Sequence, residues 1–144
     1  MIEQDTVKLL RECDAGVKMG IASINEVLDY THADGLRHRL TDCMSEHEKL
    51  KSETEKLLDD YHDSGKEPNP MAKGMSWVKT NTKLAMDDSD ATIADLMTDG
   101  CNMGVKSLNR YLNQYKAANE RSKDIAKRLI NSEKTLVDDI RSFL

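Results

Sequence analysis

The stretch that decides the fold is LRHRLTDCMSEHEKLKSETEKLLDDY, residues 36–61. Its apolar and weakly polar positions recur in alternating steps of four and three, which is the spacing of one buried face on a long α-helix. The face consists of Leu36, Leu40, Cys43, His47, Leu50, Thr54, Leu57 and Tyr61. We therefore predict a helix over about residues 36–63, ended by Gly65, Pro68 and Pro70.

The rest of the chain has the same periodicity, so we predict further helices over about residues 3–31, 71–86, 90–116 and 119–143. Asp87, Asp88, Ser89 and Asp90 supply N-cap candidates for the fourth helix. With only 2 Pro, 7 Gly and 4% aromatic residues, the composition leaves little material for a many-stranded sheet and its turns. The expected fold class is all-α, with one helical-bundle domain spanning residues 1–144.

Two parts of the chain look like copies of each other. A shift of 84 residues sets the first long helix on the third, with identical residues at all but one of the compared positions. The first set is Gly16, Met19, Gly20, Ser23, Ile24, Asn25 and Leu28, and the second is Gly100, Met103, Gly104, Ser107, Leu108, Asn109 and Leu112. A shift of 86 superposes the partner helices and sets His47 on Glu133. The pattern indicates a duplicated αα-hairpin.

The segment between the two hairpins decides how they are joined. A helix over 71–86 covers about 24 Å, and residues 65–70 cover up to about 20 Å more, which approaches the roughly 45 Å length of a 30-residue helix. A crossover of the whole bundle is therefore feasible. We predict that helices 36–63 and 90–116 run parallel and that the crossover helix packs outside the bundle.

Charge and cysteine content restrict the compartment and the partners. No segment has the roughly 18 consecutive apolar residues of a membrane span, and the acidic start is unlike a signal peptide, so we expect a cytoplasmic protein without membrane partners. Lys and Arg (21) are interleaved with Asp and Glu (26), which argues against a nucleic-acid partner. Cys13, Cys43 and Cys101 form no CxxC pair, and we predict that they are buried thiols.

The segments Met-Ala-Lys-Gly-Met-Ser-Trp (71–77), Leu-Met-Thr-Asp-Gly-Cys (96–101) and Leu-Ile-Asn-Ser-Glu-Lys-Thr-Leu-Val-Asp-Asp-Ile (129–140), together with the long hairpin, resemble ferritin-like four-helix proteins of uncharacterised bacterial families. The resemblance covers nearly the whole chain. It implies the fold and the crossover topology. It implies no enzyme, because such relatives include proteins with no established activity.

The chain lacks the residues of a di-iron centre. Ferritin-like di-iron proteins place Glu on two helices and Glu-x-x-His on the other two. No such motif lies within a helix here. Asp29-x-x-His32 and Asp59-x-x-His62 have the spacing, but we expect them at opposite ends of the bundle, facing solvent.

Polar residues interrupt the apolar faces at Asp14, His47 and Glu133, and Asp99 is a further candidate. A charge on such a face is costly unless it is paired, so we expect a buried cluster of these four residues. It can be a structural layer that fixes helix register, which we prefer, or a site for iron or another divalent metal. Partial exposure is the third reading. We expect no cofactor and no catalytic residues, because the chain has neither a Gly-rich phosphate loop nor a GxSxG motif.

Gly16, Gly20, Gly100 and Gly104 each weaken a helix by roughly 1 kcal/mol relative to Ala, which requires a compensating reason. Close approach of the first and third long helices is our prediction, and a groove beside the glycines is the alternative. A second apolar set on the crossover consists of Met71, Met75, Trp77 and Met86. We expect it to cover the bundle, with a weak homodimer as the assembly. The leading function is a non-enzymatic structural or protein-interaction module. The alternative function is metal binding or iron oxidation.

Overall fold

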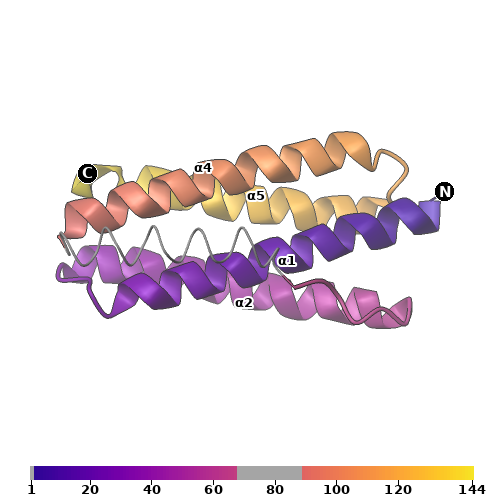
Figure 1. Ribbon diagram of the computed structural model, residues 1–144, viewed down its shortest axis with the longest axis horizontal. Coiled ribbons are helices and arrows are strands. Elements are labelled where there is room, and N and C mark those ends of the chain that lie inside the picture. Colours follow the sequence, from indigo (N-terminus) through magenta and orange to yellow (C-terminus); the bar gives the residue numbers. More distant parts are fainter. Residues whose placement is uncertain (1, 68–88) are drawn as a thin grey trace.

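A computed structural model describes residues 2–67 and 89–144, which form an α-helical bundle (Figure 1). Its helices are α1 (Ile2–Leu28), α2 (Asp34–Asp60), α4 (Asp90–Gln114) and α5 (Glu120–Ile140), followed by the 3₁₀ turn η1 (Arg141–Phe143). These two ranges contain no strand. The all-α prediction is confirmed for them, whereas the helix predicted over 71–86, with its Met and Trp residues, lies outside them. No helix in the described ranges is both long and apolar enough to cross a membrane.

The directions of the helices follow from contacts at the two ends of the bundle. At one end, the Asp90 carboxylate accepts hydrogen bonds from the backbone N–H groups of His32 and Ala33, both at 2.8 Å. At the other end, Asp5 and Thr6 accept from the backbone of the α4–α5 connection. The starts of α2 and α4 are therefore neighbours, and these helices run parallel, as predicted (Figure 1).

Capping residues define where two of the helices begin. Ser89 accepts a hydrogen bond from the Thr92 N–H at 3.2 Å, and Asn119 accepts one from the Ser122 N–H at 2.9 Å. Both satisfy backbone donors that a first helical turn leaves unpaired. The predicted Ser89 cap is thus confirmed.

The buried face of α2 follows the predicted spacing up to Thr54. The next buried residue is Leu58, while Leu57 is only partly buried. An α-helix has 3.6 residues per turn, so positions spaced by a strict seven-residue repeat drift slowly around the helix. The step of four from Thr54 to Leu58 keeps the buried face directed at the core.

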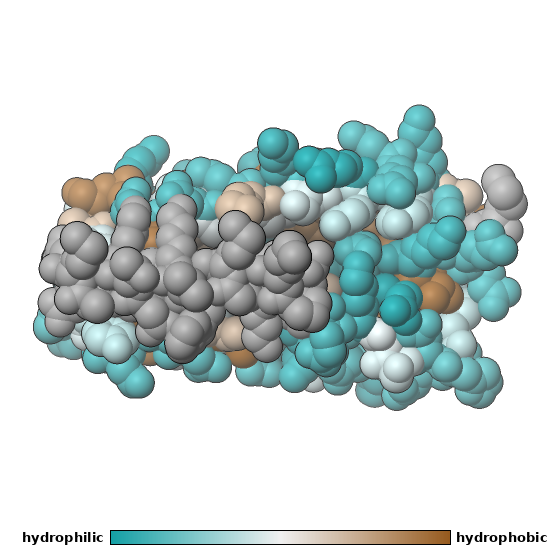
Figure 2. All heavy atoms as spheres, in the orientation of Figure 1, coloured by the Kyte–Doolittle hydropathy of each residue, from teal (hydrophilic) through white to brown (hydrophobic). Residues whose placement is uncertain are grey.

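The core divides into two apolar clusters along the bundle axis. One cluster includes Ile24, Cys43, Cys101 and Leu136, and the other includes Val17, Leu50, Leu108 and Leu129. Each helix contributes one residue to this first group and one to the second, about two turns apart. Between them lie four residues: Gly20, His47, Gly104 and Glu133. Buried polar groups thus lie between two apolar clusters. The described part of the surface seen in Figure 2 is mostly hydrophilic.

Candidate functional site

The middle of the bundle contains one polar layer, built from His47 of α2 and Glu133 of α5. His47 is 1% exposed and Glu133 is 7% exposed. Their side chains approach with 3.8 Å between His47 Nε2 and Glu133 Oε1, which is an ion-pair distance rather than a hydrogen bond. The prediction that these two residues share a buried layer is confirmed, and partial exposure is excluded for both.

The His47 ring is held from its other side. Its Nδ1 lies 3.0 Å from the Cys43 carbonyl oxygen one turn earlier on α2, which accepts a hydrogen bond from it. Cys43 Sγ at 3.6 Å and Ser132 Oγ at 3.4 Å flank the same nitrogen. This arrangement fixes the ring plane and directs Nε2 toward Glu133.

Glu133 is less completely satisfied. Burial leaves its Oε2 atom inaccessible to solvent, and no hydrogen-bond partner for that oxygen exists among the described residues. Such an oxygen loses its hydration without compensation, at a cost of about 1–3 kcal/mol. It is therefore the main unsatisfied acceptor in this layer.

The two remaining members of the layer are glycines that make room for the pair. A Cβ atom on Gly20 would lie 2.7 Å from His47 Cδ2 and 2.8 Å from His47 Nε2. A Cβ on Gly104 would lie within 3 Å of the Glu133 carboxyl carbon and Oε1, and still closer to Oε2. Each hairpin thus seats the polar residue of its second helix beneath a glycine of its first helix.

Our interpretation that the glycines allow close approach of α1 and α4 is wrong. A Cβ on Gly16 would make an ordinary contact of 3.8 Å with Leu129, and one on Gly100 would meet no described atom within 4 Å. The atoms near Gly20 and Gly104 belong to α2 and α5. The alternative interpretation, a groove beside the glycines, fits the structure.

That groove lies between α1 and α4 and has a volume of about 340 Å³. Its walls contain a motif that occurs twice, Gly-x-x-Met-Gly-x-x-Ser, which we call the glycine–methionine motif. The first copy contributes Gly16, Met19, Gly20 and Ser23, and the second contributes Gly100, Met103, Gly104 and Ser107. His47 and Glu133 also line it. We call this feature the α1–α4 groove.

The electrostatics favour an imidazolium paired with a carboxylate. Burial by itself disfavours the charged imidazole, but the interactions with Cys43 and Glu133 outweigh it and raise the pKa of His47 to about 10. Burial also raises the pKa of Glu133, and the His47 charge opposes that rise. Burial together with the Glu133 charge raises the pKa of Cys101, which keeps this nearby thiol protonated. These interactions favour an imidazolium at His47 near neutral pH, facing the Glu133 carboxyl group.

Asp14 does not join the layer, contrary to our prediction. It precedes Gly20 by six residues, which is about 9 Å along a helix axis. Its carboxylate instead binds Lys18 Nζ at 2.8 Å and accepts the Lys66 N–H at 3.0 Å. Gly65, at a φ of +88°, passes so close that a Cβ would collide with Asp14 Oδ2. Asp14 thus holds residues 63–67, the segment that follows α2, against α1.

The other predicted ligands are also elsewhere. Asp99 is exposed on α4 rather than buried beside Glu133, because its position falls on the outer face of that helix. Asp29 and His32 are exposed at one end of the bundle, and Asp59 and His62 are exposed at the other, as predicted. Within residues 2–67 and 89–144, no group of three or more His, Cys, Asp or Glu side chains is arranged to hold a metal ion.

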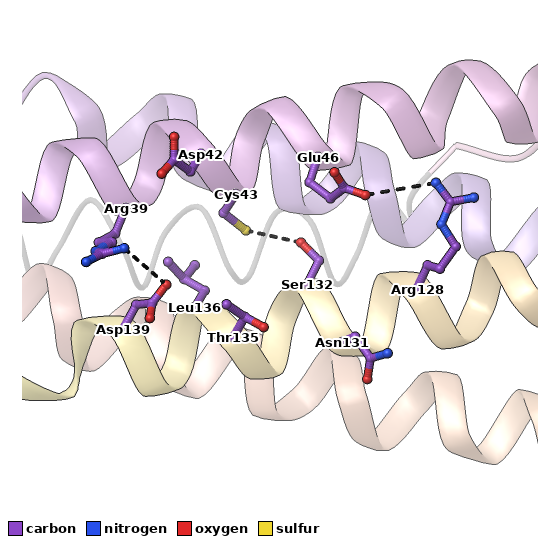
Figure 3. Close-up of a pocket in the computed structure, with 10 residues that line it drawn as sticks. All are labelled: Arg39, Asp42, Cys43, Glu46, Arg128, Asn131, Ser132, Thr135, Leu136 and Asp139. Carbon is purple, nitrogen blue, oxygen red and sulfur yellow. Dashed lines mark hydrogen bonds and ion pairs between the residues drawn. The ribbon is translucent and has the colours of Figure 1, made fainter.

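A second cavity, of about 330 Å³, lies between α2 and α5 (Figure 3). Cys43 and Ser132 point toward one another across it, with 3.7 Å between Sγ and Oγ. Arg39 and Arg128 project from opposite helices near its two ends, where they pair with Asp139 and Glu46. Asp42 also lines the cavity, so three carboxylates face two guanidinium groups there, and we assign it no ligand.

All three cysteines are free and buried, as predicted. The sequence missed the pairing of each glycine with a polar side chain, although the two shifts of 84 and 86 residues already placed Gly20 with Gly104 and His47 with Glu133. Comparisons with models of protein families, with curated proteins and with solved structures find no match. The residues of the site therefore carry the functional argument.

Proposed function

We propose that this chain is a non-catalytic structural or protein-interaction module, in which the His47–Glu133 pair fixes the register of a four-helix scaffold. The observation that carries this proposal is the seating of each charged residue under a glycine of its own hairpin, between two apolar clusters. Any axial slip of one helix would move a charge into an apolar layer, at a cost of several kcal/mol. The ferritin-like topology, the cytoplasmic location and the weak homodimer remain parts of this proposal.

A second candidate is metal binding, and one observation favours it: the buried Glu133 Oε2 atom has no hydrogen-bond partner among the described residues. Only two of the four predicted ligands, His47 and Glu133, could bind iron or another divalent metal at this place. Asp14 and Asp99 lie elsewhere. Two protein ligands make a weaker site than the three or four of typical metal centres, so the structural role is the better supported function.

The test compares the thermal stability of three variants with the wild-type protein. Glu133→Leu alone leaves the imidazole of His47 buried without its counter-charge, and we expect a loss of about 3 kcal/mol. The double change His47→Leu with Glu133→Leu removes both charges, and we expect stability within about 1 kcal/mol of wild type, or above it. His38→Leu is the control, because His38 is an exposed histidine on α2, the helix that carries His47.

A fourth variant, His47→Leu, distinguishes the metal candidate. A ligand that binds only the folded state raises the melting temperature by mass action. We expect added Fe(II), Mn(II) or Zn(II) to shift the wild type no more than the His47→Leu variant. A rise in the wild type and in His38→Leu that disappears in His47→Leu would replace the structural role with metal binding.

A further inference from the structure

The α1–α4 groove has walls of unusual composition. Each copy of the glycine–methionine motif places two glycines, a serine and a methionine on it, so one wall repeats the other. Because glycine has no side chain, the glycines leave the groove open, and the flexible thioether of methionine adapts to irregular shapes. The volume of about 340 Å³ is at the lower end of the range found for small-molecule sites.

The floor of the groove contains an acceptor without a donor. The Glu133 side chain is 9% exposed, and its Oε2 atom has no hydrogen-bond partner among the described residues. The atom lies directly beneath Gly104, since a Cβ there would collide with it. A bound molecule that donates an O–H or N–H group to this oxygen would remove the desolvation penalty.

The charges around the groove are balanced, which restricts the ligand further. On the floor, the imidazole of His47, whose raised pKa favours its positive form, faces the carboxyl group of Glu133. At one end, Lys66 Nζ pairs with Glu12 Oε1 at 2.5 Å. The phenol of Tyr111 also lines this end, whereas Ile24 and Leu96 line the other. With no net charge to neutralise, the groove favours a neutral molecule.

We propose that the α1–α4 groove binds a small neutral organic molecule with an apolar body and one hydroxyl or N–H donor, which hydrogen-bonds to Glu133 Oε2. The proposal extends the proposed function, because the polar layer then also receives a ligand. Its test measures affinity, while the test of the structural role measures stability, so either can fail without the other.

The experiment titrates the full-length protein with hexan-1-ol and with 1-methoxypentane, followed by the backbone amide resonances of Gly20, Gly100 and Gly104. These probes are isomers of equal size, and only hexan-1-ol donates a hydrogen bond. Because a hydrogen bond to a charged acceptor is the stronger kind, we expect hexan-1-ol to bind about tenfold more tightly or better. We expect hexanoate, an anion, to bind more weakly than hexan-1-ol.

Four variants locate the site. Gly100→Leu places a side chain in the open groove, and we expect at least a tenfold loss of hexan-1-ol affinity. Gly100→Ala is the milder version, with a smaller loss in the same direction. The matched control is Asn102→Leu, on the exposed side of α4, which should leave the affinity unchanged. Glu133→Gln leaves only a neutral amide oxygen as acceptor and should reduce the preference for hexan-1-ol over its isomer.

Several results would overturn the proposal. Equal affinities for the two isomers would remove the role of Glu133 as acceptor, and equal binding of hexanoate would remove the preference for a neutral ligand. Resonance shifts confined to residues outside the groove would place the site elsewhere. An unchanged affinity in both folded Gly100 variants would have the same meaning.

Discussion

Replacing Gly20 by alanine tests how the polar layer is assembled. On an ordinary helix this change is stabilising by about 1 kcal/mol, because alanine restricts the unfolded chain and is the best helix former. In this structure the new Cβ would lie 2.7 Å from His47 Cδ2. Normal contacts between carbon atoms are about 3.5–4.0 Å, so the ring would have to move by about 1 Å.

The ring has little freedom to make that movement. Its Nδ1 is hydrogen-bonded to the Cys43 carbonyl oxygen at 3.0 Å, and its Nε2 faces Glu133. Overpacking of this kind costs about 1–3 kcal/mol. The disturbed ion pair adds to this cost, whereas the higher helix propensity of alanine offsets part of it. The expected net result is a loss of about 1–2 kcal/mol in the free energy of unfolding. Gly100→Ala, with no described atom near the new Cβ, should instead stabilise by up to about 1 kcal/mol.

The assay is urea unfolding followed by circular dichroism, with a double-mutant cycle between Gly20→Ala and His47→Ala. Without the imidazole, the alanine at position 20 has no ring to displace, so it should become neutral or stabilising. We expect a coupling energy of about 1–3 kcal/mol. If Gly20→Ala were as stabilising as Gly100→Ala, or if the two changes in the cycle were additive, Gly20 would not be the seat of His47.

The pH dependence of stability follows from the raised pKa of His47, about 10 when folded against 6.5 in its ordinary state. The stability that the protonated His47 ring contributes is complete below pH 6.5 and is lost as pH rises toward 10. The urea midpoint of the wild type should therefore fall over this interval, relative to the variant with leucine at both 47 and 133. Parallel curves for the two proteins would contradict this prediction. Asp90→Ala removes the acceptor of the His32 and Ala33 N–H groups and should cost about 1–2 kcal/mol, with faster amide exchange in residues 29–34. Unchanged exchange there would show that Asp90 does not hold this turn.

The fold was largely predictable from the sequence because it depends on periodicity. The seam of α2 from Leu36 to Thr54, the burial of the cysteines and the parallel course of α2 and α4 all follow from spacing and chain length. The deviation at Leu58 arises because the helix follows a period of 3.6 rather than 3.5. These features need no knowledge of side-chain contacts.

The candidate site was predictable only in part. The predicted duplication placed His47 and Glu133 at equivalent levels, and the structure brings these two residues together. Asp14 also interrupts an apolar face, but its level relative to His47 depends on how far α1 and α2 are shifted along the bundle axis, and periodicity does not give that shift. Its partners, Lys18 and the chain at Gly65–Lys66, include a loop that no helical pattern describes.

The glycines were misread for a related reason. A pair of glycines one turn apart is compatible with close helix approach and with a seat for a bulky side chain, and sequence spacing is identical in both cases. What separates them is the neighbour: imidazole and carboxylate atoms from α2 and α5, rather than the backbone of an opposing helix.

The central claim is that His47 is a buried imidazolium paired with Glu133, and the most direct test is the protonation state of its ring. Long-range ¹H–¹⁵N correlation spectra, assigned with a His47→Leu variant, report whether both ring nitrogens carry protons. At pH 8.5 we expect both nitrogens of His47 to be protonated, with titration near pH 10 and loss of the charge in Glu133→Gln. A neutral His47 ring at pH 8.5 in the folded wild-type protein would contradict the account.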